Sequence, residues 1–164
     1  MSDGGLPVVE PPFESADAEG RSAPDDPARV AGVVLAAGTS SRFGEANKLL
    51  ATADGDPVVR RAVRTLLATP LDPLIVVLGH EAERVAAALD GLDVAFVRND
   101  AYAEGQATSV RAGVRAVRDR TDADAALVAL GDMPFVASGT VATLLDADVA
   151  GVGAALAAAH DGER

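Results

Sequence analysis

The fold is decided by the stretch VAGVVLA at residues 30–36, which consists of aliphatic and β-branched side chains and one glycine. An apolar run without polar alternation is typical of a strand that is buried on both faces. Similar short runs occupy residues 74–78, 93–97 and 125–130. We therefore predict four strands, all of them packed inside the molecule.

Amphipathic stretches separate these strands. Pro57 opens the first of them, in which apolar residues recur at helical spacing. The predicted helices are 57–67, 81–89, 108–118 and 138–145. Strands that alternate with helices predict a parallel sheet covered on both faces, with right-handed crossovers. The expected fold class is α/β, a Rossmann-like three-layer α/β/α sandwich with a mainly parallel sheet.

Length and composition predict one domain with an irregular N-terminal segment. A chain of 164 residues, 49% of them hydrophobic, can bury one sizeable core and is too short for two ordinary domains. Residues 1–28 are rich in Pro, Gly, Ser, Asp and Glu and show no sustained apolar period. We predict a disordered acidic segment at 1–28 and a folded domain at 29–164.

The formal net charge of −11 disfavours nucleic acid as a partner, because a phosphate-rich polymer would be repelled. It is typical of a strongly hydrated, halophile-like surface. The chain has no cysteine, which excludes disulfides, a thiolate zinc site and a cysteine nucleophile. No apolar run approaches the length of a membrane span and no signal segment is visible, so we expect a cytoplasmic protein without a membrane partner.

Polar and glycine-bearing segments follow the predicted strands. They occupy residues 35–48, 79–80, 99–109 and 131–134. In open parallel sheets, ligands bind beyond the carboxyl ends of the strands. We therefore expect these four segments to meet at one edge of the sheet and to form the functional site there.

The segment at residues 35–48 has the chemistry of a phosphate-binding loop. It combines Gly38 and Gly44, which let backbone amides approach oxygen atoms, with Arg42 and Lys48, the only lysine of the chain. It matches neither the dinucleotide-binding fingerprint nor the Walker pattern, because Lys48 lies too far past the glycines and precedes a leucine. The alternative interpretation is a surface turn with a solvated lysine.

Asp132 directly follows a predicted strand, so its carboxylate should lie at the ligand edge of the sheet. Mg²⁺ often takes one or two carboxylates together with phosphate oxygens, and the upstream phosphate loop favours this metal role. The alternative interpretation is an aspartate that caps the next turn.

The loop at residues 99–109 offers amide and hydroxyl groups before a helix. Asn99 and Ser109 suit contacts to a base or a ribose, whereas Thr108 or Ser109 could equally be an ordinary helix N-cap. His80 is interpreted as a loop residue, and His160 has no partner at a metal-binding spacing.

Three motifs together resemble the MobA-like NTP transferases. The family's opening signature, Leu-Ala-x-Gly-x-x-x-Arg-x-Gly followed by Lys, is matched in order at residues 35–48. A later Asn and Gly-x-x-x-Ser is similar to Asn99 and residues 105–109, and a Gly-Asp-Met-Pro turn is similar to residues 131–134. The Ala37-Gly38 pair looks like the molybdopterin cytidylyltransferase branch, since the guanylyl branch typically has Gly-Gly there.

The resemblance implies a fold like that of nucleotide-diphospho-sugar transferases, and Mg²⁺-dependent transfer of CMP from CTP to molybdopterin with release of pyrophosphate. It implies that Arg42, Lys48 and Asp132 are catalytic, with Asp132 as the metal ligand. The nucleotide-binding residues that it implies are Leu35, Ala36, Ala37, Gly38, Arg42, Lys48, Asn99 and Ser109.

Relatives of this family continue past a run that resembles residues 161–164, so we expect a sheet and an active site that are incomplete at the C-terminus. Two other functions stay open at this point. One is a non-catalytic module that binds a nucleotide or a cofactor, and the other is an NTP transferase with another phosphorylated acceptor, such as a sugar phosphate. Whether a molybdoenzyme or a chaperone is a protein partner also stays open.

Overall fold

The computed structural model describes residues 28–39 and 47–146 of the chain. Its centre is a four-stranded, fully parallel sheet in the order β5-β4-β1-β6. The strands are β1 (Val30–Ala36), β4 (Leu74–Leu78), β5 (Ala95–Arg98) and β6 (Ala125–Leu130). The prediction of a mainly parallel sheet is therefore confirmed, and the stretch that decides the fold lies between two partner strands.

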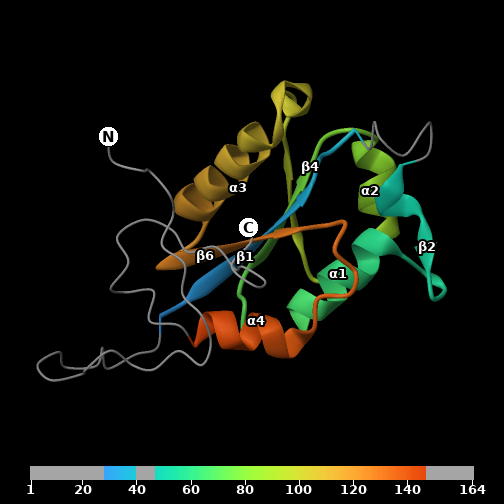
Figure 1. Cartoon of the computed structure of the whole chain (residues 1–164). Helices are drawn as coiled ribbons and strands as arrows, with labels where there is room; N and C mark the ends of the chain where they lie inside the picture. The colour runs from blue at the N-terminus through green and yellow to red at the C-terminus, as the bar shows by residue number, and fades with distance from the viewer. Residues whose placement is uncertain (1–27, 40–46, 147–164) are drawn as a thin grey trace, which may run out of the picture.

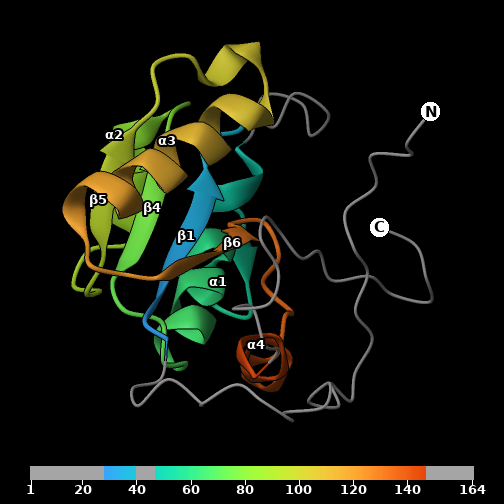
Figure 2. The ribbon, with the colours of Figure 1, turned by 90° about the vertical axis from the view of Figure 1, so that its left-hand side faces the viewer.

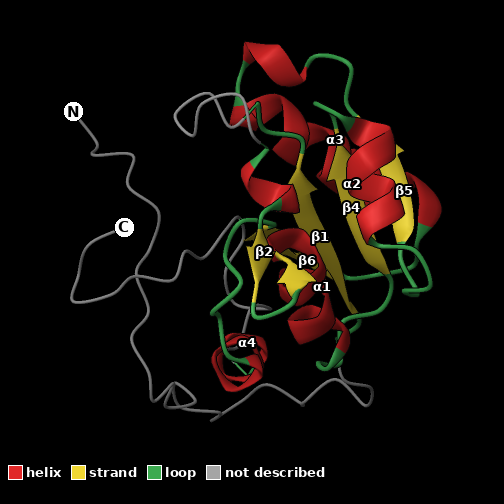
Figure 3. Cartoon of the chain, turned by 90° about the vertical axis from the view of Figure 1, so that its right-hand side faces the viewer, coloured by secondary structure: helices red, strands yellow, loops and turns green. Residues whose placement is uncertain are grey.

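Helices cover both faces of the sheet, as Figures 1 and 2 show. One face carries α3 (Gln106–Arg120), and the other carries α1 (Val58–Leu67), α2 (Ala82–Ala88) and α4 (Ser138–Leu145). Figure 3 shows the second face from the side of α2. The predicted three-layer α/β/α sandwich is thus confirmed for the described residues.

The alternation of side chains along β1 explains the two layers of core. Val33 and Leu35 are buried against α3, while Val34 and Ala36 are buried on the side of α1. Helix α3 lies close to the sheet because Gly113 has no side chain. A Cβ atom at that position would lie 2.3 Å from Cγ1 of Val33, so a larger residue would push the helix away.

Three short features were not predicted from the sequence, a hairpin and two 3-10 turns. A hairpin forms between β2 (Thr52–Ala53) and β3 (Asp56–Pro57), and its turn residues Asp54 and Gly55 both have positive φ, at 49° and 90°. An Asp-Gly pair is the usual signal for such a turn, so the sequence did carry the information. The 3-10 turns η1 (Lys48–Leu50) and η2 (Tyr102–Glu104) were missed as well.

Some predicted boundaries shift for local reasons. Strand β5 begins at Ala95 and not at residue 93, because the backbone amide of Val94 donates to the carbonyl of Leu92 in a turn. Helix α3 begins at Gln106, with Gly105 at the N-cap position. The alternative in which Thr108 or Ser109 is the N-cap was therefore wrong, since both residues lie within the first turns of the helix.

Among the described residues, β6 is an edge strand of the sheet, and apolar side chains near this edge are exposed. Val128 on β6 and Val114 on α3 are 40% and 45% exposed. The predicted disordered segment lies outside the described residues except for Ala28, and so does the C-terminal part for which an incomplete sheet was expected. Within the described ranges, no helix is long and apolar enough to cross a membrane.

Candidate functional site

The carboxyl ends of β1 and β6 open onto a cavity of about 640 Å³. It is lined from segments that are far apart in the sequence, as expected for the ligand edge of a parallel sheet. Its lining residues are Leu35, Ala37, Gly38, Thr39, Lys48, Leu49, Tyr102, Ala103, Gly105, Gln106, Ser109, Leu130 and Asp132. Six residues that we predicted for the site are among them: Leu35, Ala37, Gly38, Lys48, Ser109 and Asp132.

Two other predicted residues do not line the cavity, and a third lies outside the described residues. The side chain of Ala36 does not line the cavity, because it is fully buried in the core on the side of α1. Asn99 lies behind the cavity wall, where it is 6% exposed. Arg42 lies outside the described residues, as does His160. His80 packs its ring against Tyr102, with ring centroids 6.1 Å apart. It lines neither this cavity nor a second cavity of about 550 Å³ that shares Lys48 and Asp132 with it.

Asn99 holds the start of α3 in place. Its amide nitrogen donates to Thr108 Oγ1 at 2.9 Å and to Ser109 Oγ at 3.0 Å, and its Oδ1 atom accepts from the backbone amide of Ala101 at 3.1 Å. The first turn of α3 thereby lies at the cavity, with Gln106 and Ser109 in its lining. Backbone amides at a helix N-terminus favour an anionic group such as a phosphate.

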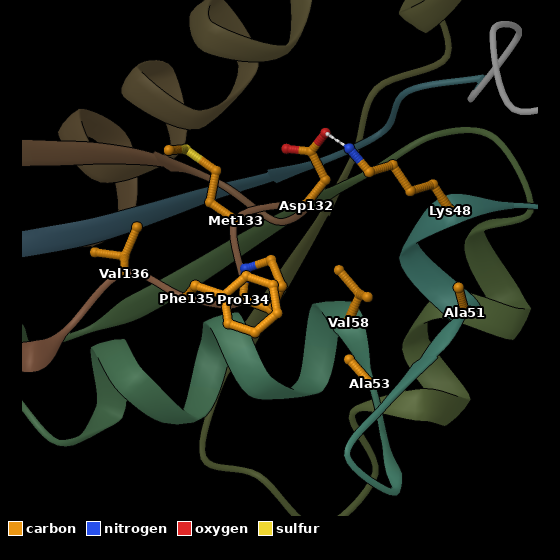
Figure 4. A pocket seen from close by; sticks show the side chains of 9 residues that line it. All are labelled: Lys48, Ala51, Ala53, Val58, Asp132, Met133, Pro134, Phe135 and Val136. Carbon is orange, nitrogen blue, oxygen red and sulfur yellow. Dashed lines mark hydrogen bonds and ion pairs between the residues drawn. The ribbon is translucent and has the colours of Figure 1, made fainter. Parts of the chain in front are cut away.

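Lys48 and Asp132 form an ion pair at the floor of the cavity. The distance from Lys48 Nζ to Asp132 Oδ2 is 3.2 Å, and the two side chains are 41% and 39% exposed (Figure 4). An ion pair with this much exposure contributes little to stability, on the order of 0–1 kcal/mol. Both charges remain accessible to a ligand, so the pair suits binding better than it suits a structural role.

The position of Lys48 is determined by its neighbour Asn47. Asn47 is 7% exposed, and its Oδ1 atom accepts the backbone amide of Leu49 at 3.1 Å, which caps the 3-10 turn that begins at Lys48. The side chain of Asn47 also lies beside the carboxylate of Glu81 and contributes to lowering its pKa. Glu81 thus connects α2 to the turn that carries the lysine.

Hydrogen bonds keep the carboxylate of Glu81 ionised. The hydrogen bond from Arg84, and to a lesser extent the neighbouring side chain of Asn47, lower the pKa of Glu81 below its usual value. Glu81 has a left-handed backbone conformation with φ of 50°, immediately before α2. Neither Asn47 nor Glu81 was predicted as a site residue. The only available signal was an Asn directly before the single lysine of the chain.

Tyr102 is another lining residue that the sequence analysis did not select. A Cβ atom at Gly79 would lie 2.7 Å from the Cβ atoms of both Ala37 and Tyr102. Only glycine therefore lets the tyrosine approach the end of the sheet so closely. The cavity accordingly combines an aromatic ring, a glycine turn and a lysine, which is a set of groups that suits a nucleotide.

The residues present fit a metal ion that is shared with a bound phosphate. Among the described residues there is no group of three or more His, Cys, Asp or Glu side chains that would hold a metal by itself. Mg²⁺ is commonly held by one or two carboxylates together with substrate phosphates and water. Asp132 can supply one carboxylate of this kind at the cavity floor.

A three-layer α/β sandwich with a lysine, an aspartate and a helix N-terminus at its strand ends defines an α/β domain of the nucleotide-binding class. The comparison with family models makes this specific. The model of the MobA-like NTP transferase domain matches residues 32–164, so the chain belongs to this family. The predicted family is thereby confirmed.

The relatives agree with this assignment. A probable molybdenum cofactor guanylyltransferase of Natronomonas pharaonis is 34% identical over 106 residues, which cover 64% of this chain and 50% of the relative. A solved nucleotidyl transferase from Methanothermobacter is 34% identical with a TM-score of 0.62, over 71% of this chain and 56% of that one. The chain therefore spans about half the length of such relatives.

A relative whose structure contains manganese is also similar to this chain. The Mycobacterium tuberculosis protein Rv0371c in complex with manganese is 32% identical with a TM-score of 0.54, and the match covers 72% of this chain and 58% of that one. Nucleotidyltransferases typically use a divalent metal, and this relative fits that pattern.

Proposed function

We propose that this chain is the nucleotide-binding part of a transferase that moves CMP from CTP to molybdopterin and releases pyrophosphate. The observation that supports the proposal most directly is the Lys48–Asp132 pair at the floor of the 640 Å³ cavity. A lysine suits the charge of a triphosphate, and an adjacent carboxylate suits Mg²⁺ bound to that triphosphate.

The residues around the cavity then have distinct roles. Leu35, Ala37 and Gly38 approach the base and the ribose, and Lys48 together with Arg42 neutralises the triphosphate. Ser109 contacts the nucleotide from the first turn of α3, while Asn99 acts by positioning that turn. Asp132 holds Mg²⁺.

The reaction itself is an in-line displacement at the α-phosphorus of the nucleotide. An oxygen of the acceptor phosphate forms the new P–O bond, and the bond to pyrophosphate breaks. Bound Mg²⁺ would stabilise negative charge on the phosphates. Lys48 would donate hydrogen bonds to the departing pyrophosphate, whose charge grows in the transition state. The acceptor phosphate is already an anion at neutral pH, so the chain has no need of a general base.

The choice of CTP rests on Ala37-Gly38 in the opening signature, whereas the Natronomonas relative is named a guanylyltransferase. Calorimetric titration with CTP and with GTP, each with and without Mg²⁺, tests this choice. We expect CTP to bind more tightly than GTP and Mg²⁺ to strengthen the binding. Tighter binding of GTP would assign the chain to the guanylyl branch, and no binding of either nucleotide would reject the proposed function.

A non-catalytic nucleotide-binding module is the second candidate, since the same cavity could bind a nucleotide without turnover. It predicts the same CTP binding without release of pyrophosphate when an acceptor is added. In either case we propose a cytoplasmic location, where nucleoside triphosphates are made.

The link from Glu81 through Asn47 predicts an effect at a distance. Glu81→Ala should weaken CTP binding several-fold, because Glu81 lies beside Asn47, whose Oδ1 atom caps the turn that begins at Lys48. Glu81→Gln keeps a hydrogen-bond acceptor and should restore most of the affinity. Glu83→Ala is the matched control, since Glu83 is another glutamate of α2, pairs with Arg98 and lines neither cavity.

A double-mutant cycle separates this effect from a general loss of structure. In a Lys48→Ala background, Glu81→Ala should cause little further loss of CTP affinity. An equal loss in both backgrounds would show that Glu81 does not act through the lysine.

A further inference from the structure

The outer side of α3 is basic, although the net charge of the chain is −11. The helix carries one acidic residue, Asp119, and four arginines, which are Arg111, Arg115, Arg118 and Arg120. The first three arginines are spaced by four and three residues, so they share one side of the helix, and all three are exposed. In Figure 2, α3 is the outer layer on its face of the sheet. Arg111, Arg115 and Arg118 are here called the arginine face.

The arginine face has fewer acidic partners than the arginines elsewhere in the fold. Outside α3, four arginines each pair with a nearby carboxylate: Arg61, Arg64, Arg84 and Arg98. On α3, Arg118 pairs with its neighbour Asp119 at 2.8 Å, whereas Arg111 and Arg115 form no ion pair within the described part of the chain. The hydrogen bond from Arg118 lowers the pKa of Asp119 below its usual value, and the charges of Arg115 and Arg120 add to this effect. The potential over this side of α3 is therefore positive.

An exposed apolar side chain lies within the arginine face. Val114 comes three residues after Arg111 and four before Arg118, so it is adjacent to both on the helix surface, and it is 45% exposed. Val128 of β6 is 40% exposed and lies on the same side of the sheet as α3, since it is in register with Val33, which packs under that helix. A ligand that fits this surface has to combine negative charge with apolar side chains.

Residues 1–27 of the same chain have this composition. They lie outside the described residues, and they contain seven acidic residues and one arginine. Within them, the stretch LPVVEPPFE at residues 6–14 combines Leu, Val and Phe side chains with two glutamates. The segment therefore complements the arginine face both in charge and in its apolar residues.

This segment joins the fold beside the C-terminal end of α3. The backbone amide of Arg29 donates to a carboxylate oxygen of Asp124 at 2.9 Å, and the amide of Asp124 donates to the carbonyl of Arg29 at 2.8 Å. Asp124 comes four residues after Arg120, the last residue of the helix. A helix of 15 residues is about 22 Å long, which about seven extended residues can cover. The segment is thus long enough to reach the whole arginine face.

We propose that residues 1–27 dock on the arginine face of α3 in the same chain, with acidic side chains at Arg111 and Arg115 and apolar side chains at Val114. Because the segment is covalently joined to the fold, its effective concentration at α3 is on the order of mM, so a contact that is weak between separate molecules is populated. The inference goes beyond the proposed function and does not depend on it, since the arginine face lines neither cavity.

Paramagnetic relaxation measured by NMR tests the contact in the full chain. The chain has no cysteine, so Ser15→Cys provides a single attachment site for a nitroxide spin label. At low salt, we expect the label to broaden the amide signals of residues 111–118 more than those of α1, which covers the opposite face of the sheet. Salt at 1 M, where the Debye length is about 3 Å, should remove most of this broadening.

The arginines are tested by replacing all three of them. Arg111→Gln/Arg115→Gln/Arg118→Gln should remove the preferential broadening of α3 at low salt, because the acidic segment loses its partners. A second variant makes the same test from the other side of the contact and leaves the described residues unchanged. In it, Glu10→Gln, Glu14→Gln and Asp17→Asn are combined, and the same loss is expected.

The matched control removes the same charge from elsewhere on the surface. Arg64→Gln/Arg84→Gln/Arg98→Gln replaces three exposed arginines of α1, α2 and β5. The broadening of α3 should persist in this variant.

Three results would overturn the inference. The first is equal broadening of the α3 and α1 signals, and the second is broadening of α3 that survives in either of the charge-neutralised test variants. The third comes from mixing spin-labelled chain with isotope-labelled chain that carries no spin label. Broadening of α3 in the latter would show that the segment of a second copy occupies the arginine face.

Discussion

Lys48→Ala will lower the affinity for CTP by about tenfold to one hundredfold, because a charge-assisted hydrogen bond to a phosphate contributes about 1.5–3 kcal/mol. Lys48 is the only lysine of the chain and lies at the floor of the nucleotide cavity. Its ion pair with Asp132 is more than a third exposed on both sides, so the substitution should change stability little. Calorimetric titration with CTP measures the loss.

Two variants serve as controls for the lysine. Lys48→Arg keeps the charge and should retain a large part of the affinity, although its planar guanidinium donates in another geometry. Arg64→Ala removes a cation of the same charge from α1, where it pairs with Asp56 at 2.8 Å and lines neither cavity. It should bind CTP normally. An unchanged affinity in Lys48→Ala would reject the assignment of residues 35–48 as a phosphate-binding loop.

Asp132→Asn will abolish the strengthening of CTP binding by Mg²⁺, because the amide removes the carboxylate that we propose as metal ligand. In the absence of Mg²⁺, the same substitution should not weaken CTP binding. The carboxylate repels a triphosphate and lies 3.2 Å from Lys48 Nζ, so its neutralisation should leave metal-free binding unchanged or make it tighter. The side chains have nearly the same shape, which keeps the packing at the strand end intact.

The measurement is the ratio of CTP affinities with and without Mg²⁺. We expect a ratio of about ten or more for the unchanged chain and a ratio near one for Asp132→Asn. Asp56→Asn is the control, since this aspartate pairs with Arg64 and lies outside both cavities. A variant at Asp132 that keeps the full Mg²⁺ effect would show that the metal has another ligand. In a chain that turns over, the same variant should lose transfer activity with little change in metal-free binding.

Lys48 and Asp132 lie where the cavity at the strand ends adjoins the second cavity of about 550 Å³. A displacement at phosphorus needs an attacking and a departing group in line, so the reacting phosphates must meet where the two substrates adjoin. The only residues that line both cavities are Lys48 and Asp132, within the part of the chain that the structure describes.

The secondary structure could be predicted because it follows from local patterns. Strands β1, β4 and β6 begin and end at the predicted residues, since continuous apolar runs bounded by polar residues mark buried strands. Helix α4 also has its predicted bounds. The misses were short elements. The Asp54-Gly55 hairpin and the 3-10 turn at Lys48 each span too few residues to show a period.

The sequence by itself determined the α/β class, the family, and the segments that meet at the carboxyl ends of the strands. These properties depend on periodicity and on motifs that each occupy a short stretch of chain. Gly38, Lys48, Ser109 and Asp132 were found in this way, and they do line one cavity.

Only the tertiary structure decided how these residues are used. Lys48 and Asp132 are 84 residues apart, and they pair because β1 and β6 are neighbours in the sheet. The burial of Ala36 on the side of α1, the position of Glu81 beside Asn47 and the second, mainly apolar cavity likewise depend on contacts between distant segments. Such contacts have no local period, because they arise from strand order and side-chain packing, which a linear pattern does not encode.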